Sequence, residues 1–196
     1  MLIFPFVIFL VILTYYIRKN TRSEKELQAQ FWQKENQANT TRRKDISRLD
    51  YVEIPANILT PPVTEDDEIA ACYNTLSALS KQKILNLNNL TNTQLKLTYG
   101  AANLSLLTSY DENYTTLICT LVKLGKKLIE NSLFEEAVSI LHFGVTCKSD
   151  ITENYTLLAS LYKKLGRDGD LTVLYTCVQM LPSAKKEHIL KKLNQI

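Results

Sequence analysis

Few side chains in this sequence could act as nucleophiles or metal ligands, and their spacing supports no recognised reaction. His142 and Cys147 come closest to a nucleophilic pair, but they are five residues apart. Residues on one helix share a face when they are three or four apart, so this pair does not meet. No two histidines have metal-ligand spacing, and there is no glycine-rich phosphate loop, G-x-S-x-G or H-E-x-x-H motif. The sequence therefore predicts no catalytic residue, no metal and no cofactor. An enzyme with an unrecognised site is the weakest hypothesis for the function of this protein.

Charge is distributed unevenly along the chain. Residues 18–48 contain 9 basic and 4 acidic side chains, whereas residues 49–80 contain 6 acidic and no basic ones. The net charge of the whole chain is only +3, which is too small to indicate nucleic acid. Because the basic block directly follows an apolar segment, a membrane surface explains it better. The residues suited to anionic lipid are Arg18, Lys19, Arg22 and Lys25.

The apolar segment, residues 1–17, reads MLIFPFVIFLVILTYYI, with Thr14 as its one plainly polar side chain. Seventeen helical residues reach about 25 Å, the short end of what crosses a bilayer. A cleaved signal peptide is the rival interpretation, but no basic side chain precedes the apolar run and large residues follow it. The sequence therefore predicts an uncleaved transmembrane anchor over residues 1–17.

The positive side chains after the anchor predict its orientation, because they favour the cytoplasmic face. The four cysteines form no C-x-x-C pair and lie among apolar neighbours, which agrees with a reducing compartment. We therefore expect a single-pass membrane protein whose C-terminal domain is cytoplasmic.

Three regions follow from composition: the anchor, a basic juxtamembrane stalk over residues 18–63, and a helical domain over residues 64–196. Residues 21–44 are polar and tolerate a helix, either a solvated or lipid-surface helix or one that docks onto the domain. Residues 45–55 are rich in β-branched and aromatic side chains, which predicts an extended segment packed along the domain.

From Thr64 onward the apolar residues recur at helical spacing, and the predicted fold class is all-α. Glycine is scarce, at 5 of 196 residues, which suits helices. The boxes Ser109-x-x-Glu112 and Ser132-x-x-Glu135, with Asp150-x-x-Glu153 as a looser version, predict three helix starts. Helices are expected near residues 65–79, 110–130, 133–147, 151–165, 170–181 and 183–195. In the less clear stretch 81–108, two short helices separated by a break at Gly100 are expected.

Two of these helical hairpins repeat with a period of about 34 residues. The first contains Leu121-x-x-Leu124-Gly125-x-x-Leu128, and the second contains Tyr155-x-x-Leu158-Ala159-x-x-Tyr162. A small residue at the centre of each lets paired helices approach closely. This pattern resembles the tetratricopeptide repeat over about residues 118–182. Leu171 departs from it, since the family prefers a small alanine there.

The resemblance implies antiparallel helical hairpins whose first helices line a groove for a peptide or helix of a partner protein. It places the groove at Val122, Lys126, Ile129, Thr156, Ser160 and Lys163. Two lysines beside apolar side chains would suit an acidic-hydrophobic segment, although simple solvation explains them equally well. The hypothesis is a membrane-anchored module that recruits or scaffolds a protein partner. The first alternative is an accessory subunit that packs through its transmembrane segment inside a larger membrane complex.

Overall fold

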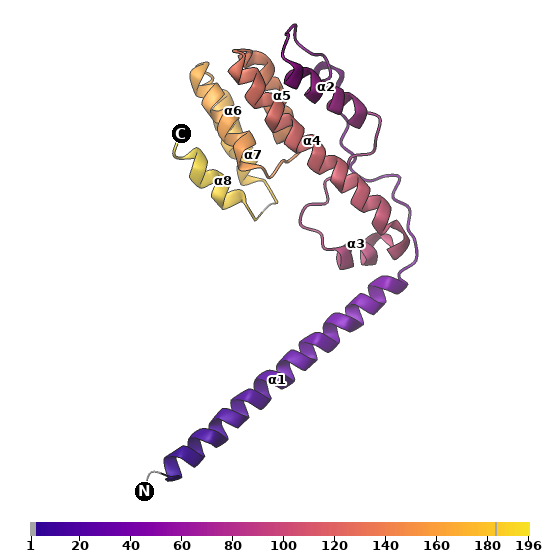
Figure 1. Ribbon diagram of the computed structural model, residues 1–196, viewed down its shortest axis with the longest axis vertical. Helices are drawn as coiled ribbons and strands as arrows, with labels where there is room; N and C mark the ends of the chain where they lie inside the picture. Colours follow the sequence, from indigo (N-terminus) through magenta and orange to yellow (C-terminus); the bar gives the residue numbers. More distant parts are fainter. Residues whose placement is uncertain (1–2, 183) are drawn as a thin grey trace. The chain divides into compact units, whose positions relative to one another are not determined.

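A computed structural model describes residues 3–182 and 184–196, except for a number of side chains between residues 3 and 23 (Figure 1). The described residues form eight α-helices and two short 3-10 helices, with no strand and one isolated antiparallel bridge between Tyr51 and Leu85. The all-α prediction is confirmed. The α-helices are α1 (Ile3–Thr40), α2 (Asp67–Leu79), α3 (Asn92–Tyr99), α4 (Leu104–Glu130), α5 (Phe134–Thr146), α6 (Thr152–Lys164), α7 (Asp168–Gln179) and α8 (Lys186–Leu193).

The chain divides into two compact units. The first unit joins the residues up to Ile46 with Thr91–Leu104, so it contains α1 and α3. The second unit joins Ser47–Leu90 with Ser105–Ile196, so it contains α2, nearly all of α4, and α5 to α8. The regions 18–63 and 64–196, which were predicted from composition, do not coincide with these units. Each unit contains residues of both regions.

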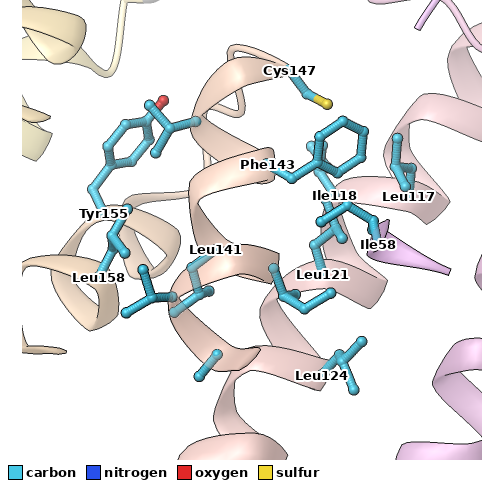
Figure 2. Packing of buried hydrophobic residues seen from close by; sticks show 14 of the residues in the cluster. Ile58, Leu117, Ile118, Leu121, Leu124, Leu141, Phe143, Cys147, Tyr155 and Leu158 are labelled. Carbon is cyan, nitrogen blue, oxygen red and sulfur yellow. The ribbon is translucent and has the colours of Figure 1, made fainter. Parts of the chain in front are cut away.

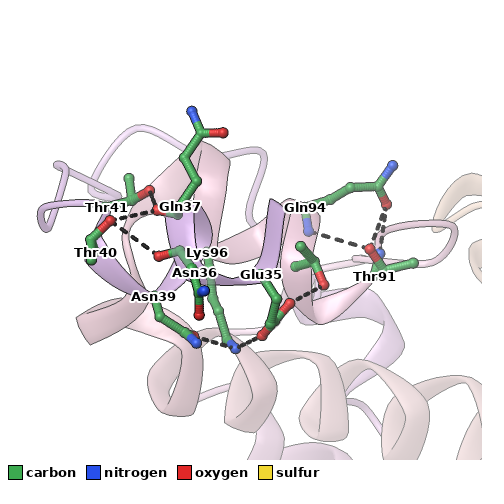
Figure 3. A network of polar contacts seen from close by, with 10 residues as sticks. Glu35, Asn36, Gln37, Asn39, Thr40, Thr41, Thr91, Gln94 and Lys96 are labelled. Carbon is green, nitrogen blue, oxygen red and sulfur yellow. Dashed lines mark hydrogen bonds and ion pairs between the residues drawn. The ribbon is translucent and has the colours of Figure 1, made fainter. Parts of the chain in front are cut away.

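In the first unit, the C-terminal end of α1 docks onto α3. Ala38 and Leu95 are buried there. The Glu35 carboxylate pairs with Lys96 and accepts a hydrogen bond of 2.6 Å from Thr93 (Figure 3). These contacts show that the predicted polar helix docks at its C-terminal end, whereas its middle stays exposed.

The chain after α1 crosses the chain after α3 at very short range. Gly100 has φ +93°, and a Cβ atom there would lie 2.3 Å from the Arg42 carbonyl oxygen. Asn103 is fully buried beside this crossing, and its amide nitrogen donates to the carbonyl oxygens of Lys44 (2.8 Å) and Tyr99 (2.7 Å). The predicted break at Gly100 is therefore confirmed, because only glycine fits this conformation and contact.

In the second unit, α5 lies between α4 and α6 and shares its core with both (Figure 2). Leu121 and Leu124 from α4 and Leu158 from α6 are fully buried around Leu141 of α5. The predicted extended segment 45–55 is extended over residues 50–55 only, because residues 47–49 form a turn. Val52 donates its backbone N–H to the carbonyl oxygen of Ile84 at 2.9 Å.

The three predicted helix caps are wrong. Ser109 lies inside α4, which begins at Leu104. Ser132 has φ +61° and belongs to the turn that ends α4, so its hydroxyl does not cap α5. α6 follows Ile151 without a side-chain cap. Two of the three predicted helix starts are nevertheless confirmed to within one residue, since α5 begins at Phe134 and α6 at Thr152, whereas α4 begins five residues before Ser109.

Other side chains cap α2 and α3. Asp66 accepts hydrogen bonds from the backbone N–H groups of Glu68 (2.8 Å) and Ile69 (3.2 Å), which satisfies donors at the start of α2. A reciprocal capping box joins Thr91 and Gln94 at the start of α3. Both helices thus begin at capped ends.

In the part of the chain that the structure describes, no helix carries an apolar stretch long enough to cross a membrane. The predicted anchor, residues 1–17, falls at the start of α1. Residues 1 and 2, and most side chains of residues 3–17, lie outside the described residues. The anchor therefore stays a prediction.

Candidate partner-binding face

The repeat period of the sequence, which is the spacing from Leu121 to Tyr155, is also present in the helix ends. α4 ends at Glu130, and α6 ends one period later at Lys164. α5 begins at Phe134, and α7 begins one period later at Asp168. The chain therefore forms two successive helical hairpins with the same turn length.

The turns of the two hairpins also share one geometry. Ser132 (φ +61°) and Gly166 (φ +67°) occupy equivalent left-handed positions. The next residue donates back to the preceding helix in each case, from Leu133 to Leu128 at 2.9 Å and from Arg167 to Tyr162 at 2.8 Å. This bond closes a helix C-terminus in the manner of a Schellman motif. The repeat thus extends to backbone conformation and hydrogen bonding.

Close helix contact occurs where the small residues lie. A Cβ atom on Gly125 of α4 would come within 2.6 Å of the Leu141 side chain on α5. Ala159, its equivalent on α6, is buried. The expectation that small residues permit close approach is confirmed for Gly125, because Leu141 occupies the space that a larger residue would need.

α8 continues the same register. It begins at Lys186, one repeat period after the start of α6 at Thr152. Ile189 and Leu193 are buried. The remaining side of α8 is exposed and polar at Glu187, His188, Lys191 and Lys192. α8 therefore buries one side and leaves the other polar and exposed.

The six residues predicted to line the groove, hereafter the groove face, differ in exposure. Ser160 and Lys163 of α6 are exposed, and Thr156 is half-buried. Ile129 of α4 is half-buried, whereas Val122 is only 6% exposed. Val122 therefore contributes mainly to packing, and the accessible part of the face comes from Lys126, Ile129 and the α6 residues.

The polar members of the groove face all have partners within the chain. Lys126 Nζ lies 2.8 Å from a Glu153 carboxylate oxygen, which links α4 to α6. Lys163 Nζ donates to the carbonyl oxygen of Ile196 at 2.7 Å. Thr156 and Ser160 donate to backbone carbonyl oxygens within α6. A partner that binds these lysines must replace their present contacts.

Glu153 is the member of this face that the sequence did not reveal. Its position near the start of α6 suggested only a capping role, which it does not have. Lys126 lies much earlier in the chain, on α4, so no local spacing relates the two. Only the repeat register, which places α4 beside α6, could have suggested the pair.

The other lysines of α4 are paired with α2. Lys127 Nζ lies 2.6 Å from Glu68 and 3.0 Å from Glu130, and Lys123 lies 3.5 Å from Glu68. The hydrogen bond from Lys127 lowers the pKa of Glu68, and the hydrogen bond to Glu68 raises the pKa of Lys127. The basic residues near the end of α4 are therefore largely neutralised within the chain.

His142 and Cys147 do not form a nucleophilic pair. Cys147 is buried, and burial raises the pKa of its thiol to about 12. His142 is exposed instead, with Nδ1 3.2 Å from the Tyr162 hydroxyl. It lines a cavity of about 30 Å³ together with Val145, Tyr162, Asp170, Val173, Leu174 and Cys177. That volume holds about one water molecule, and among the described residues no three His, Cys, Asp or Glu side chains are placed to bind a metal.

The fold and this face define an all-α protein with two helical hairpins that repeat in helix ends and turn geometry, and a further helix in the same register. Comparison with family models, curated proteins and solved structures yields no match for this chain.

Proposed function

We propose that this protein is a membrane-anchored interaction module that recruits or scaffolds a protein partner through a tetratricopeptide-like helical groove. The observation that carries the proposal is that helix ends, left-handed turn residues and turn hydrogen bonds all recur with the repeat period. In arrays of this kind, each helical pair buries one side against its neighbours and leaves a continuous surface for binding.

The chemistry of the groove face suits an acidic-hydrophobic segment of the partner. Ile129 and Thr156 supply half-buried surface, and Ser160 and Lys163 are exposed beside them. A carboxylate of the partner would take the place of Glu153 at Lys126. Because this ion pair is about half exposed at both ends, such an exchange costs little.

The membrane part of the proposal rests on residues 1–17 as a single-pass anchor, with the C-terminal domain in the cytoplasm. Arg18, Lys19, Arg22 and Lys25 follow the anchor and suit the anionic headgroups of that leaflet. α1 continues as one helix to Thr40. The part of α1 beyond position 17 extends about 35 Å at about 1.5 Å per residue, so the C-terminal end of α1, which docks onto α3, lies well clear of the bilayer.

Site-specific photocrosslinking tests the proposed groove. A photoreactive residue at Ser160 is compared with one at Thr172, which is exposed on α7, outside the groove face. We expect an adduct of one defined mass from Ser160 in native membranes, lost on Lys126→Glu because an acidic partner is repelled. No adduct from Ser160, or the same adduct from Thr172, would show that this face is not the binding surface.

The proposed orientation has a separate test. A cysteine replaces Asn36, which is exposed on α1, in a chain whose two cysteines that are not buried, Cys119 and Cys177, are changed to serine. A membrane-impermeant thiol reagent is expected to label it in permeabilised cells only. Labelling in intact cells would place the domain on the opposite side of the membrane.

A further inference from the structure

An apolar strip on the exposed middle of α1 has no partner among the described residues. Leu27 and Phe31 are 64% and 56% exposed. They are four residues apart, so they lie one above the other on the same side of the helix. Trp32 is 55% exposed and packs edge-on against Phe31, with ring centroids 5.4 Å apart. A group of exposed apolar side chains within a polar stretch of helix is typical of an interaction surface.

The same side of α1 is already covered where the helix ends. Ala38 lies seven residues, or two turns, beyond Phe31 and is fully buried where α1 docks onto α3. The strip therefore continues an established helix–helix interface into a stretch that α3 does not reach. This stretch, residues 24–34, is called the open seam below.

Distance along the helix argues against lipid as the cover. With residues 1–17 as the anchor of the proposed function, on which this inference rests, Leu27 lies about 15 Å and Phe31 about 21 Å beyond the anchor at about 1.5 Å per residue. The polar headgroup layer on one side of a bilayer is only about 5–8 Å thick. The open seam therefore stands above the headgroups, and protein must cover it.

We propose that the open seam pairs in parallel with the open seam of a second copy of this chain. Anchors in one bilayer place the same residues of both copies at the same height and in the same direction, so the identical apolar strips face each other. Gln28 and Gln30 flank the strip, whereas the charged Lys25 and Glu26 lie further round the helix. The uncharged flanks add no repulsion between like charges beside Leu27 and Phe31 in an in-register parallel pair.

Charged residues at both ends of the open seam limit its strength. Glu24 and Lys34 lie on the same side as Leu27 and Phe31, so each would oppose its own counterpart in the second copy. The pair is therefore weak in solution. Confinement of both copies to one membrane raises their effective concentration and favours it.

Cysteine crosslinking of the full chain in its membrane tests the pairing. Leu27→Cys is compared with Ala29→Cys, which is at nearly the same height on the opposite side of α1; both positions are exposed. Both variants are made in a chain with serine at the native Cys119 and Cys177, the two cysteines that are not buried. We expect disulfide-linked dimer from Leu27→Cys at about fivefold or more above Ala29→Cys, since seam positions face each other in a parallel pair. Equal crosslinking of the two variants, or none from Leu27→Cys, would overturn the pairing.

Two further substitutions in the Leu27→Cys chain are expected to change the dimer fraction in opposite directions. Phe31→Ser is expected to lower the dimer fraction about fivefold or more, because it removes the larger apolar side chain of the seam. Glu24→Gln is expected to raise it about two- to fivefold at limiting oxidant, because it removes a repulsion between like charges. A fall on Glu24→Gln, or no change on Phe31→Ser, would contradict the in-register geometry.

Carbonate extraction of the same samples separates this inference from the proposed function. Membrane-bound chain without a Leu27→Cys dimer disproves the pairing and leaves the anchor intact. Chain released by carbonate that still gives the Leu27→Cys pattern disproves the anchor and leaves the pairing intact. Released chain without dimer disproves both.

Discussion

Alanine substitution at three glycines separates the effect of backbone conformation from that of close contact. Gly169 has no atom within 4 Å of its would-be Cβ and lies in the first turn of α7, so Gly169→Ala is expected to stabilise the fold by about 0.5–1 kcal/mol. Gly166 is equally open but has φ +67°, so Gly166→Ala is expected to cost about 1–2 kcal/mol.

Gly100→Ala combines both penalties. The φ of +93° is unfavourable for any other residue, and the new Cβ would lie 2.3 Å from the Arg42 carbonyl oxygen and 2.7 Å from Arg43 Cα. These are backbone atoms that cannot rotate away, so the chain crossing must separate. With about 1–2 kcal/mol from conformation and about 1–3 kcal/mol from overpacking, we expect a loss of roughly 3 kcal/mol in the first unit.

Hydrogen exchange resolved by peptide measures this loss where it occurs. About 3 kcal/mol corresponds to a factor of roughly 150 in local opening, so the amides of α3 should exchange about two orders of magnitude faster in Gly100→Ala. The amides of α6 provide the internal reference.

The order of the three variants is the decisive result. Stability should fall from Gly169→Ala through Gly166→Ala to Gly100→Ala. If Gly100→Ala exchanged like the unmodified protein, the Arg42 carbonyl would not lie against Gly100, and the account of the crossing would be wrong. If Gly166→Ala cost as much as Gly100→Ala, conformation rather than contact would dominate at both positions.

Three further outcomes follow from other contacts. Gly144→Ala should destabilise the protein by about 1–2 kcal/mol in urea titrations, because its Cβ would lie 2.5 Å from the buried Asn154 amide oxygen and overpacking outweighs the gain in helix propensity. The pKa of Glu35 is lowered by the hydrogen bond from its lysine partner on α3, so its stabilisation is present above the ordinary value of 4.5 and is lost as the pH falls through the lower folded pKa. Glu35→Gln should therefore abolish this acid-dependent opening of α1 from α3 in hydrogen exchange. A maleimide should modify the exposed Cys119 at once and the buried Cys147 only in denaturant, and rapid modification of both would contradict the burial.

Apolar spacing predicted most of the fold, because helices form where they bury a continuous apolar face. The pattern through Ile69, Cys72 and Leu76 gave α2, and Gly100 marked the break before α4. The predicted caps failed at Ser109 and Ser132. At Ser109 the buried face of α4 has already begun at Leu107, so burial overrides a cap that is worth about 1 kcal/mol. Ser132 instead occupies the left-handed turn between α4 and α5.

The groove face could be predicted only in part. The repeat period predicted that α4 and α6 are equivalent helices of successive hairpins. Small residues such as Gly125 predicted where helices come into close contact. The partners of its lysines could not be predicted. Lys126 meets Glu153 and Lys163 meets the backbone of Ile196. Both contacts join residues far apart in the chain, and their existence depends on how neighbouring helices pack.

Because the lysines of the groove face already have partners within the chain, they also indicate which contacts must supply the affinity for a bound partner. An exposed ion pair such as Lys126–Glu153 is typically worth about 0.2–1 kcal/mol, and a partner carboxylate that replaces Glu153 recovers a similar amount. The exchange is then nearly neutral, so these lysines select for an acidic partner without binding it tightly. The net gain must come from burial of apolar surface at about 25 cal/mol per Å², and on this face Ile129 is the half-buried apolar side chain that can supply it. Truncating Ile129 should therefore weaken a partner more than neutralising Lys126.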